Sequence, residues 1–186
     1  HTLSLHDALP IYLDIGESGN GIPDIIDEAR NEVDLFLRLR DGDAYCQGLT
    51  NPDNSHTIMF QAGATTMAAW ANAANCALLA ESFRISGHHD LKDYYTKEAV
   101  KAFEFAGKQD NLQLDDRQDV GNCSMRGRDF KQMAAAFLYN VTGDTKWETI
   151  LAEESVVKNK ESKIVNKSHW YQIHGTAAYL NTPQKR

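Results

Sequence analysis

Residues 63–86 of the chain read GATTMAAWANAANCALLAESFRIS, with alanine on nearly every face of the helix that the spacing predicts. Gly87 follows directly and is a typical stop signal for a helix. A helix with small side chains on most of its faces packs closely against neighbours on several sides. This stretch therefore predicts a buried, inner helix of an α-helical domain.

Further helices are expected on both sides of this stretch. Apolar side chains recur at helical spacing over residues 22–40, 90–107, 129–141, 144–151 and 175–180. Residues 44–61 carry no sustained period, and residues 115–127 begin with acidic side chains, so both segments are expected to be loops. In the helix after Gly87 we expect Asp90 to be the cap. Tyr94 and Tyr95 should then face inward, and Glu98 should face water.

Small-residue helices alternate with amphipathic helices along the chain. The stretch 129–141 contains a second block of small residues, Ala134–Ala136, and 175–180 is small and apolar again. This alternation suits a toroid of helical hairpins, with inner helices crowded around an axis and outer helices wet on one face. A plain bundle would give similar helices, whereas the absence of a fixed repeat disfavours a solenoid.

Composition excludes several classes of protein. Lys and Arg number 19 and Asp and Glu 26, so the net charge is −7, and a nucleic-acid partner is not expected. No apolar run approaches the length of a membrane span. The three cysteines are far apart, which excludes a disulfide framework and a CxxC-type zinc site.

The sequence contains only weak candidates for a catalytic or metal-binding cluster. His88 and His89 follow Gly87 and are interpreted as a solvated turn, and His169 and His174 lack a carboxylate partner for a metal. The acidic residues after position 114 are interpreted as a water-facing loop, because catalytic carboxylates need a shielded place. No Ser-His-Asp order, P-loop or dinucleotide motif is present.

One segment of the sequence is a more specific signal than these clusters. Residues 17–30 read ESGNGIPDIIDEAR and closely resemble the ESGNGIPD(I/L)LDEAR segment of glycoside hydrolase family 9, the inverting β-glycanases. Downstream similarities follow in the family's order, at residues 63–77, at 128–144 and at Ser168-His169-Trp170 with Gly175. The resemblance covers about Leu13 to Leu180.

The resemblance implies an (α/α)6 barrel of six inner and six outer helices, of which this chain would be about half. Residues 13–182 would form part of the catalytic domain. Residues 1–12, HTLSLHDALPIY, resemble a translated adapter at a contig edge, so we expect them to be a non-native leader. The family's catalytic carboxylates lie outside the matched range, so no catalytic residue is assigned and the chain by itself is expected to be inactive. Glu17 and Asp24 are interpreted as capping and dipole residues instead.

The same resemblance suggests three substrate-binding residues. Trp170 aligns with a tryptophan on which a glucosyl ring stacks, His56 lies where the family often places a sugar-contacting histidine, and Arg128 flanks a cleft-side loop. No organic cofactor is implied. Some members bind structural calcium at an Asp-Glu pair, but here the pair is Asp129-Phe130, which lacks one oxygen ligand, so no metal site is predicted.

We therefore predict part of a secreted or periplasmic hydrolase of β-1,4-glucosidic bonds. Its partner would be a β-glucan polysaccharide or oligosaccharide, cleaved by inverting acid/base hydrolysis. The alternative is a non-catalytic helical-hairpin domain that serves as a binding module or scaffold.

Overall fold

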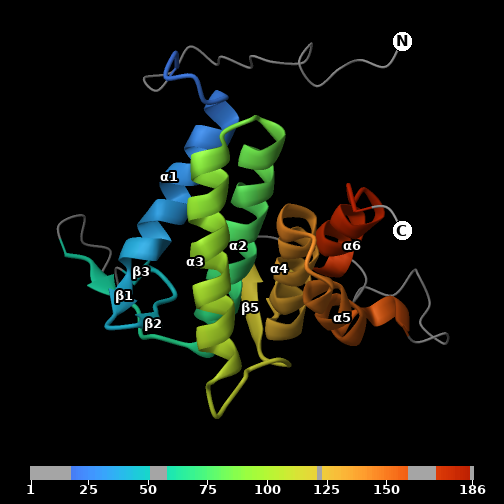
Figure 1. The fold of residues 1–186 in the computed structure, drawn as a ribbon. Helices are drawn as coiled ribbons and strands as arrows, with labels where there is room; N and C mark the ends of the chain where they lie inside the picture. Colours follow the sequence, from blue (N-terminus) through green and yellow to red (C-terminus); the bar gives the residue numbers. More distant parts are fainter. Residues whose placement is uncertain (1–17, 51–57, 121–122, 159–170, 185–186) are drawn as a thin grey trace, which may run out of the picture.

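The computed structural model of the chain describes residues 18–50, 58–120, 123–158 and 171–184. These residues are mostly helical, so the all-α class predicted from the sequence is confirmed. Figure 1 shows the helices in order across the molecule, from α1 at the left, through α3 and α2, to α4, α5 and α6 at the right.

The first helix, α1 (Asp24–Arg38), begins after a turn whose polar side chains bind one another. Ser18 Oγ donates to Asp24 Oδ2 at 2.6 Å, and Asn20 Nδ2 donates to Asp27 Oδ2 at 2.7 Å. Both carboxylates lie in the first turn of the helix, where the helix dipole favours negative charge. The dipole role expected for Asp24 thus agrees with its place at the helix start.

Two short antiparallel hairpins follow α1, in the region that the sequence leaves without periodic structure. Strands of two residues are too short to show the alternation of polar and apolar side chains that would reveal them in the sequence. The first hairpin pairs β1 (Arg40–Asp41) with β2 (Ala44–Tyr45), and the second pairs β3 (Leu49–Thr50) with β4 (Phe60–Gln61).

The alanine-rich stretch forms α2 (Thr66–Ile85), which is buried along most of its length. Thr65 caps it, because its Oγ1 accepts a hydrogen bond from the Ala68 backbone N–H at 3.0 Å. α2 contacts α1, α3 and α4. It is therefore approached from more than one side, as its small side chains predict.

The next helix, α3 (His89–Gly107), corrects three sequence predictions. His88, not Asp90, is the residue that precedes the helix, and Asp90 lies in its first turn. Tyr95 is buried, but Tyr94 is 48% exposed. Glu98 is 8% exposed instead of facing water, because Arg40 and Lys101 bind its carboxylate.

Asp115 and Asp116 lie in an exposed loop after α3, as predicted, but the predicted loop is replaced by strands from Arg117 onward. β5 (Arg117–Val120) pairs antiparallel with β6 (Cys123–Arg126), and β6 runs directly into α4 (Gly127–Thr142). The two strands are held by hydrogen bonds to each other, and such pairing leaves no pattern in the sequence of either strand alone.

The last helices are α5 (Thr145–Glu154), the short 3₁₀ helix η2 (Val156–Lys158) and α6 (Ile173–Leu180). Gly143 ends α4 with a φ of +70°, and Asp144 Oδ1 then accepts from the Lys146 backbone N–H at 2.9 Å to cap α5. Both signals are readable in the sequence.

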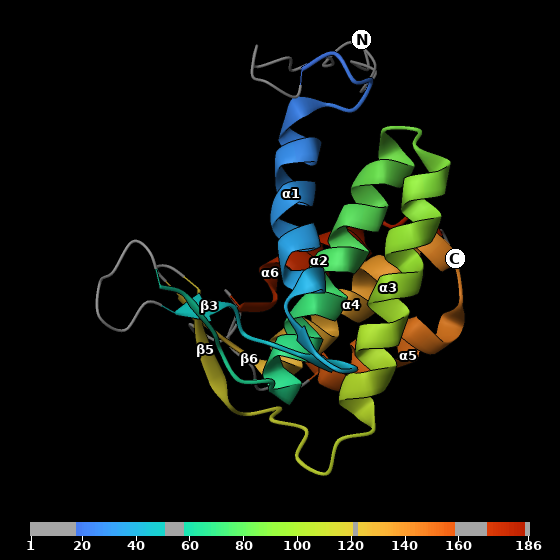
Figure 2. The same ribbon diagram turned by 90° about the vertical axis from the view of Figure 1, so that its left-hand side faces the viewer.

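The helices pack so that the small-residue helices lie next to one another. α2 contacts α4, and α4 contacts α6, while α3 packs on α2 and α5 packs on α4. The two views agree on this arrangement (Figures 1 and 2). The ring of Phe103 lies edge-to-face against the rings of Trp70 and Trp147, with centroid distances of 4.9 and 5.0 Å. These contacts join α3 to α2 and α5 in one core.

None of the helices in the described ranges is long and apolar enough to cross a membrane.

Candidate functional site

Arg128, the one predicted substrate-binding residue within the described ranges, lies in the first turn of α4. Its Nε and Nη2 donate to the Asp115 carboxylate at 2.9 and 3.1 Å, and its Nη1 donates to Glu154 Oε2 at 3.0 Å. Lys131 Nζ binds the other oxygen of Glu154 at 2.7 Å. The guanidinium thus ties the loop before β5 to the end of α5.

The charges of this cluster stabilise one another. The hydrogen bonds between Asp115 and Arg128 lower the pKa of the carboxyl and raise the pKa of the guanidinium. Asp115 is exposed, so this pair contributes little to the free energy of folding. Glu154, in contrast, is nearly buried between two cations. Arg128 therefore keeps a fixed orientation and its full positive charge.

Next to Arg128, a buried carboxylate organises the start of α4. Asp129 is fully buried, and its two oxygens accept from the Arg126 guanidinium at 3.0 and 2.9 Å and from the Arg126 backbone N–H at 2.9 Å. Gln172 Nε2 donates to Asp129 Oδ1 at 3.0 Å. Asp129 therefore accepts hydrogen bonds from the Arg126 backbone N–H as well as from the Arg126 and Gln172 side chains.

Gln172 connects the two ends of the segment that holds Trp170. Its Oε1 accepts from the Val156 backbone N–H at 2.8 Å, and its Nε2 also donates to the Glu154 carbonyl at 3.0 Å. Val156 lies shortly before residues 159–170, and Gln172 lies two residues after them. Gln172 thus holds the described residues before position 159 to those after position 170.

The other two predicted substrate-binding residues, His56 and Trp170, lie outside the described residues. The structure therefore does not bring the three predicted residues together, and their shared role stays a prediction. The β3–β4 pairing joins Leu49 to Gln61 and Thr50 to Phe60, on either side of residues 51–57. Within the described part of the chain, no group of three His, Cys, Asp or Glu side chains is placed to hold a metal.

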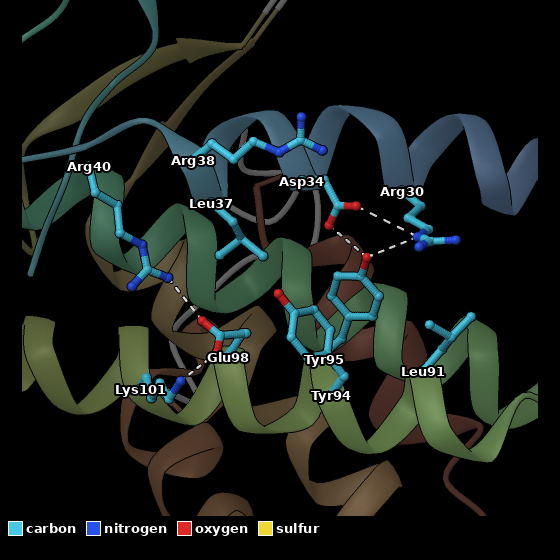
Figure 3. Close-up of a pocket in the computed structure, with 10 residues that line it drawn as sticks. All are labelled: Arg30, Asp34, Leu37, Arg38, Arg40, Leu91, Tyr94, Tyr95, Glu98 and Lys101. Atoms are coloured by element: carbon cyan, nitrogen blue, oxygen red, sulfur yellow. Dashed lines mark hydrogen bonds and ion pairs between the residues drawn. The ribbon is translucent and has the colours of Figure 1, made fainter.

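A second feature, which the sequence analysis missed, is a groove between α1 and α3. We call it the α1–α3 groove. Its volume is about 650 Å³, and Figure 3 shows the side chains that line it. They are Arg30, Asp34, Leu37, Arg38, Arg40, Leu91, Tyr94, Tyr95, Glu98 and Lys101.

Two hydrogen-bonded networks hold the charged side chains of the α1–α3 groove. In one, the Tyr95 hydroxyl donates to Asp34 Oδ1 at 2.7 Å and accepts from Arg30 Nε at 3.2 Å. In the other, Glu98 accepts from Arg40 Nη2 at 2.9 Å and from Lys101 Nζ at 2.6 Å. Both networks are visible as dashed lines in Figure 3.

These networks shift the titration of two groups. Burial raises the pKa of the Tyr95 phenol, and its hydrogen bond to Asp34 raises it further. Burial alone would raise the pKa of Glu98, but the hydrogen bonds from Lys101 and Arg40 lower it. Near neutral pH the groove therefore contains a neutral phenol and a charged carboxylate.

Part of the α1–α3 groove could have been found in the sequence. Arg30 and Asp34 are four residues apart, a spacing that places them on one face of a helix. Lys101 could have been found as a partner of Glu98 in the same way, because it lies three residues further along α3. Arg40 could not, because it lies 58 residues away and comes from another element.

The histidine pair after α2 also differs from expectation. His88 Nε2 lies 2.9 Å from the Gly21 carbonyl oxygen, and Nδ1 lies 3.0 Å from Ser86 Oγ. His88 therefore links the end of α2 to the turn before α1. His89 is exposed, but it is the first residue of α3 and does not belong to a solvated turn.

Comparison with protein-family models gives no match to this chain. Comparisons with curated proteins and with solved structures give no match either. The resemblance to glycoside hydrolase family 9 therefore rests on the residues and motifs of the sequence alone.

Proposed function

We propose that this chain is part of the catalytic domain of an inverting β-1,4-glucan hydrolase related to glycoside hydrolase family 9. The observation that carries the proposal is the segment from Glu17 to Arg30. Its side chains from Ser18 onward form the bonded turn in front of α1, with Ser18 on Asp24 and Asn20 on Asp27. The specific residues of the segment thus have specific partners, which supports reading it as a motif.

The packing of the helices gives the proposal its second support. A hairpin barrel requires small-residue helices beside one another and amphipathic helices outside them. Contacts of α2 with α4 and of α4 with α6, with α3 and α5 packed on them, agree with half of such an (α/α)6 barrel. A plain bundle would not require the small residues of three helices to follow this order.

Inverting hydrolysis requires a general acid and a general base about 6.5–9.5 Å apart, with the attacking water between them. We assign neither group to this chain. In the proposal, Arg128 and the segment that ends at Gln172 belong to the wall of the glucan cleft. Trp170 stacks on a sugar ring and His56 binds a hydroxyl group. No organic cofactor is needed, and the protein would act outside the cytoplasm.

The test is hydrolysis by the complete gene product that contains these residues. Reducing-end release should be measured on cellulose, mixed-linkage glucan, xyloglucan and chitin oligosaccharides, and NMR should follow the anomer formed first. Release of the inverted anomer from a β-1,4-glucan would support the proposal. Release of the retained anomer would contradict the inverting mechanism. Binding of glucan without hydrolysis would favour the non-catalytic helical-hairpin domain instead.

A further inference from the structure

We propose that the α1–α3 groove binds a carboxylate-bearing saccharide. The side chains of the groove indicate that its ligand is an anion. The saccharide part rests also on the proposed function, because a protein that handles polysaccharides meets sugar acids.

The first step is charge. The groove is lined by four cations, Arg30, Arg38, Arg40 and Lys101, and by two carboxylates, Asp34 and Glu98. The chain as a whole has a net charge of −7, so the groove is a local excess of positive charge on an acidic protein. Such a concave, positively charged surface attracts anions and concentrates them near it.

The second step is the supply of hydrogen-bond donors. Glu98 is shared by Arg40 and Lys101, so one carboxylate serves two cations. Arg40 Nε has no acceptor among the described residues, but it is buried, so a ligand in the groove does not reach it. The Arg38 guanidinium at the α1 wall is also without a hydrogen bond or ion pair within the described part of the chain. Guanidinium groups bind carboxylates in a planar geometry with two hydrogen bonds, so the exposed Arg38 guanidinium favours a carboxylate ligand.

The third step is the apolar surface beside these donors. Tyr94 is 48% exposed, and its ring is held edge-to-face against Tyr95 at 4.8 Å. Leu37 and Leu91 lie in the same groove, as Figure 3 shows. An inorganic anion has no apolar surface that could pack on an exposed aromatic ring, whereas the C–H face of a sugar ring packs on it. The volume of about 650 Å³ accommodates one or a few sugar units.

The fourth step is the arrangement of the remaining polar groups. Asp34, Tyr95 and Arg30 form one chain of donors and acceptors along the groove, and Arg40, Glu98 and Lys101 form a second. Sugar hydroxyls both donate and accept, so a saccharide can join either chain. The networks also hold these side chains in place before a ligand arrives, which lowers the entropy lost on binding.

The experiment is calorimetric titration of the whole chain at low salt with tri-galacturonate, cellotriose and citrate. We expect binding of tri-galacturonate, and much weaker binding of the neutral saccharide and of the non-saccharide anion. Added salt should weaken the binding of tri-galacturonate, because the groove is open to solvent. Arg38→Gln and Tyr94→Ala should each weaken it about tenfold, the loss expected for one charge-assisted hydrogen bond or one stacking surface.

The matched control is Lys97→Gln, which removes the same charge from an exposed position of α3 that does not line the groove. It should leave the affinity unchanged. Equal losses in Lys97→Gln and Arg38→Gln would overturn the inference, as would no binding of tri-galacturonate. Cellotriose or citrate binding as tightly as tri-galacturonate would also overturn it. If tri-galacturonate binds but the complete protein does not hydrolyse glucan, the proposed function is contradicted and the groove inference stands. If the protein hydrolyses glucan but tri-galacturonate does not bind, the groove inference is contradicted and the proposed function stands.

Discussion

The side-chain amide of Gln172 donates a hydrogen bond to the carboxylate of Asp129 at 3.0 Å, and both side chains are almost completely buried. Asp129 orients the start of α4, and Gln172 holds Val156 and Glu154 at the end of α5. This one bond therefore couples two helices and both ends of the segment 159–170. The two residues are 43 positions apart in the sequence.

The first prediction concerns this bond. Asp129→Ala should lower the free energy of unfolding by about 3 kcal/mol, because it leaves the Arg126 guanidinium and one N–H of the Gln172 amide without their acceptor. Gln172→Ala should lower it by about 2 kcal/mol, because buried donors and acceptors lose their partner. Urea unfolding of both variants and of the double variant should show coupling of the two changes.

Asp115→Asn is the control for this series. The Asp115 side chain is 78% exposed although it binds Arg128, so its removal should change the free energy of unfolding by at most about 1 kcal/mol. Losses that simply add in the double variant would show that Asp129 and Gln172 do not act through their mutual bond.

The second prediction concerns His88, which joins the turn before α1 to the end of α2. His88→Ala removes the contacts with the Gly21 carbonyl and the Ser86 hydroxyl, and should cost about 1 kcal/mol of stability. Hydrogen exchange should become faster at the amides of residues 18–24. His89→Ala, at an exposed neighbouring position, should change neither quantity. Equal acceleration in the two variants would exclude the link.

The sequence predicts the helices well where the signal is local. Gly87 and Gly143 have φ of +82° and +70°, and Asp144 caps α5, as expected from residue type alone. Asp90 fails as a cap, because the chain leaves Gly87 in a left-handed conformation and His88 already precedes the first helical turn. Helix existence therefore follows from periodicity, whereas the exact first residue depends on how the turn is built.

Predictions fail where the partner comes from another element. The sequence prediction places Glu98 on the water-facing side of α3, because the periodicity of the helix cannot reveal its partner Arg40. The same periodicity wrongly predicts that Tyr94 faces inward. The candidate site also depends on partners that lie far apart in the sequence. Arg128 is readable as a cation in the matched motif, but its orientation depends on Asp115 and Glu154, which lie 13 and 26 residues away.

The third prediction concerns alkaline pH. Burial raises the pKa of the Cys76 thiol and of the Tyr95 phenol in the folded protein. In the unfolded chain these groups ionise near pH 8.5 and pH 10. Above about pH 8.5 the unfolded state therefore binds fewer protons than the folded state, and the free energy of unfolding falls as the pH rises. Urea unfolding between pH 7 and about 10.5 should show this decline.

Two variants separate the contributions to this slope. Cys76→Ala should flatten the decline that begins near pH 8.5, and Tyr95→Phe should flatten the decline that begins near pH 10. Both variants lose some stability at neutral pH through smaller or less polar side chains, so the comparison is of slopes. Slopes equal to that of the parent chain would show that neither group retains its proton through folding.

The fourth prediction concerns the close packing of α2. Ala69 and Ala73 lie four residues apart on one face of the helix, and both have no exposed area. Leucine at either position inserts several carbon atoms where the surroundings leave no room. Overpacking of this kind costs about 1–3 kcal/mol. Urea unfolding of Ala69→Leu and Ala73→Leu should therefore show clear losses of stability.

Ala71→Leu is the matched control, because it makes the same substitution on the same helix. Ala71 is half-buried and lines a cavity of about 320 Å³ together with Asn72 and Phe130, so a leucine side chain has space there. Alanine and leucine are both good helix formers, so helix propensity does not distinguish the three variants. Stability should be nearly unchanged in Ala71→Leu. Comparable stability of all three variants would show that α2 is not tightly enclosed at Ala69 and Ala73, and the barrel proposal would then lose the inner helix on which its packing argument depends.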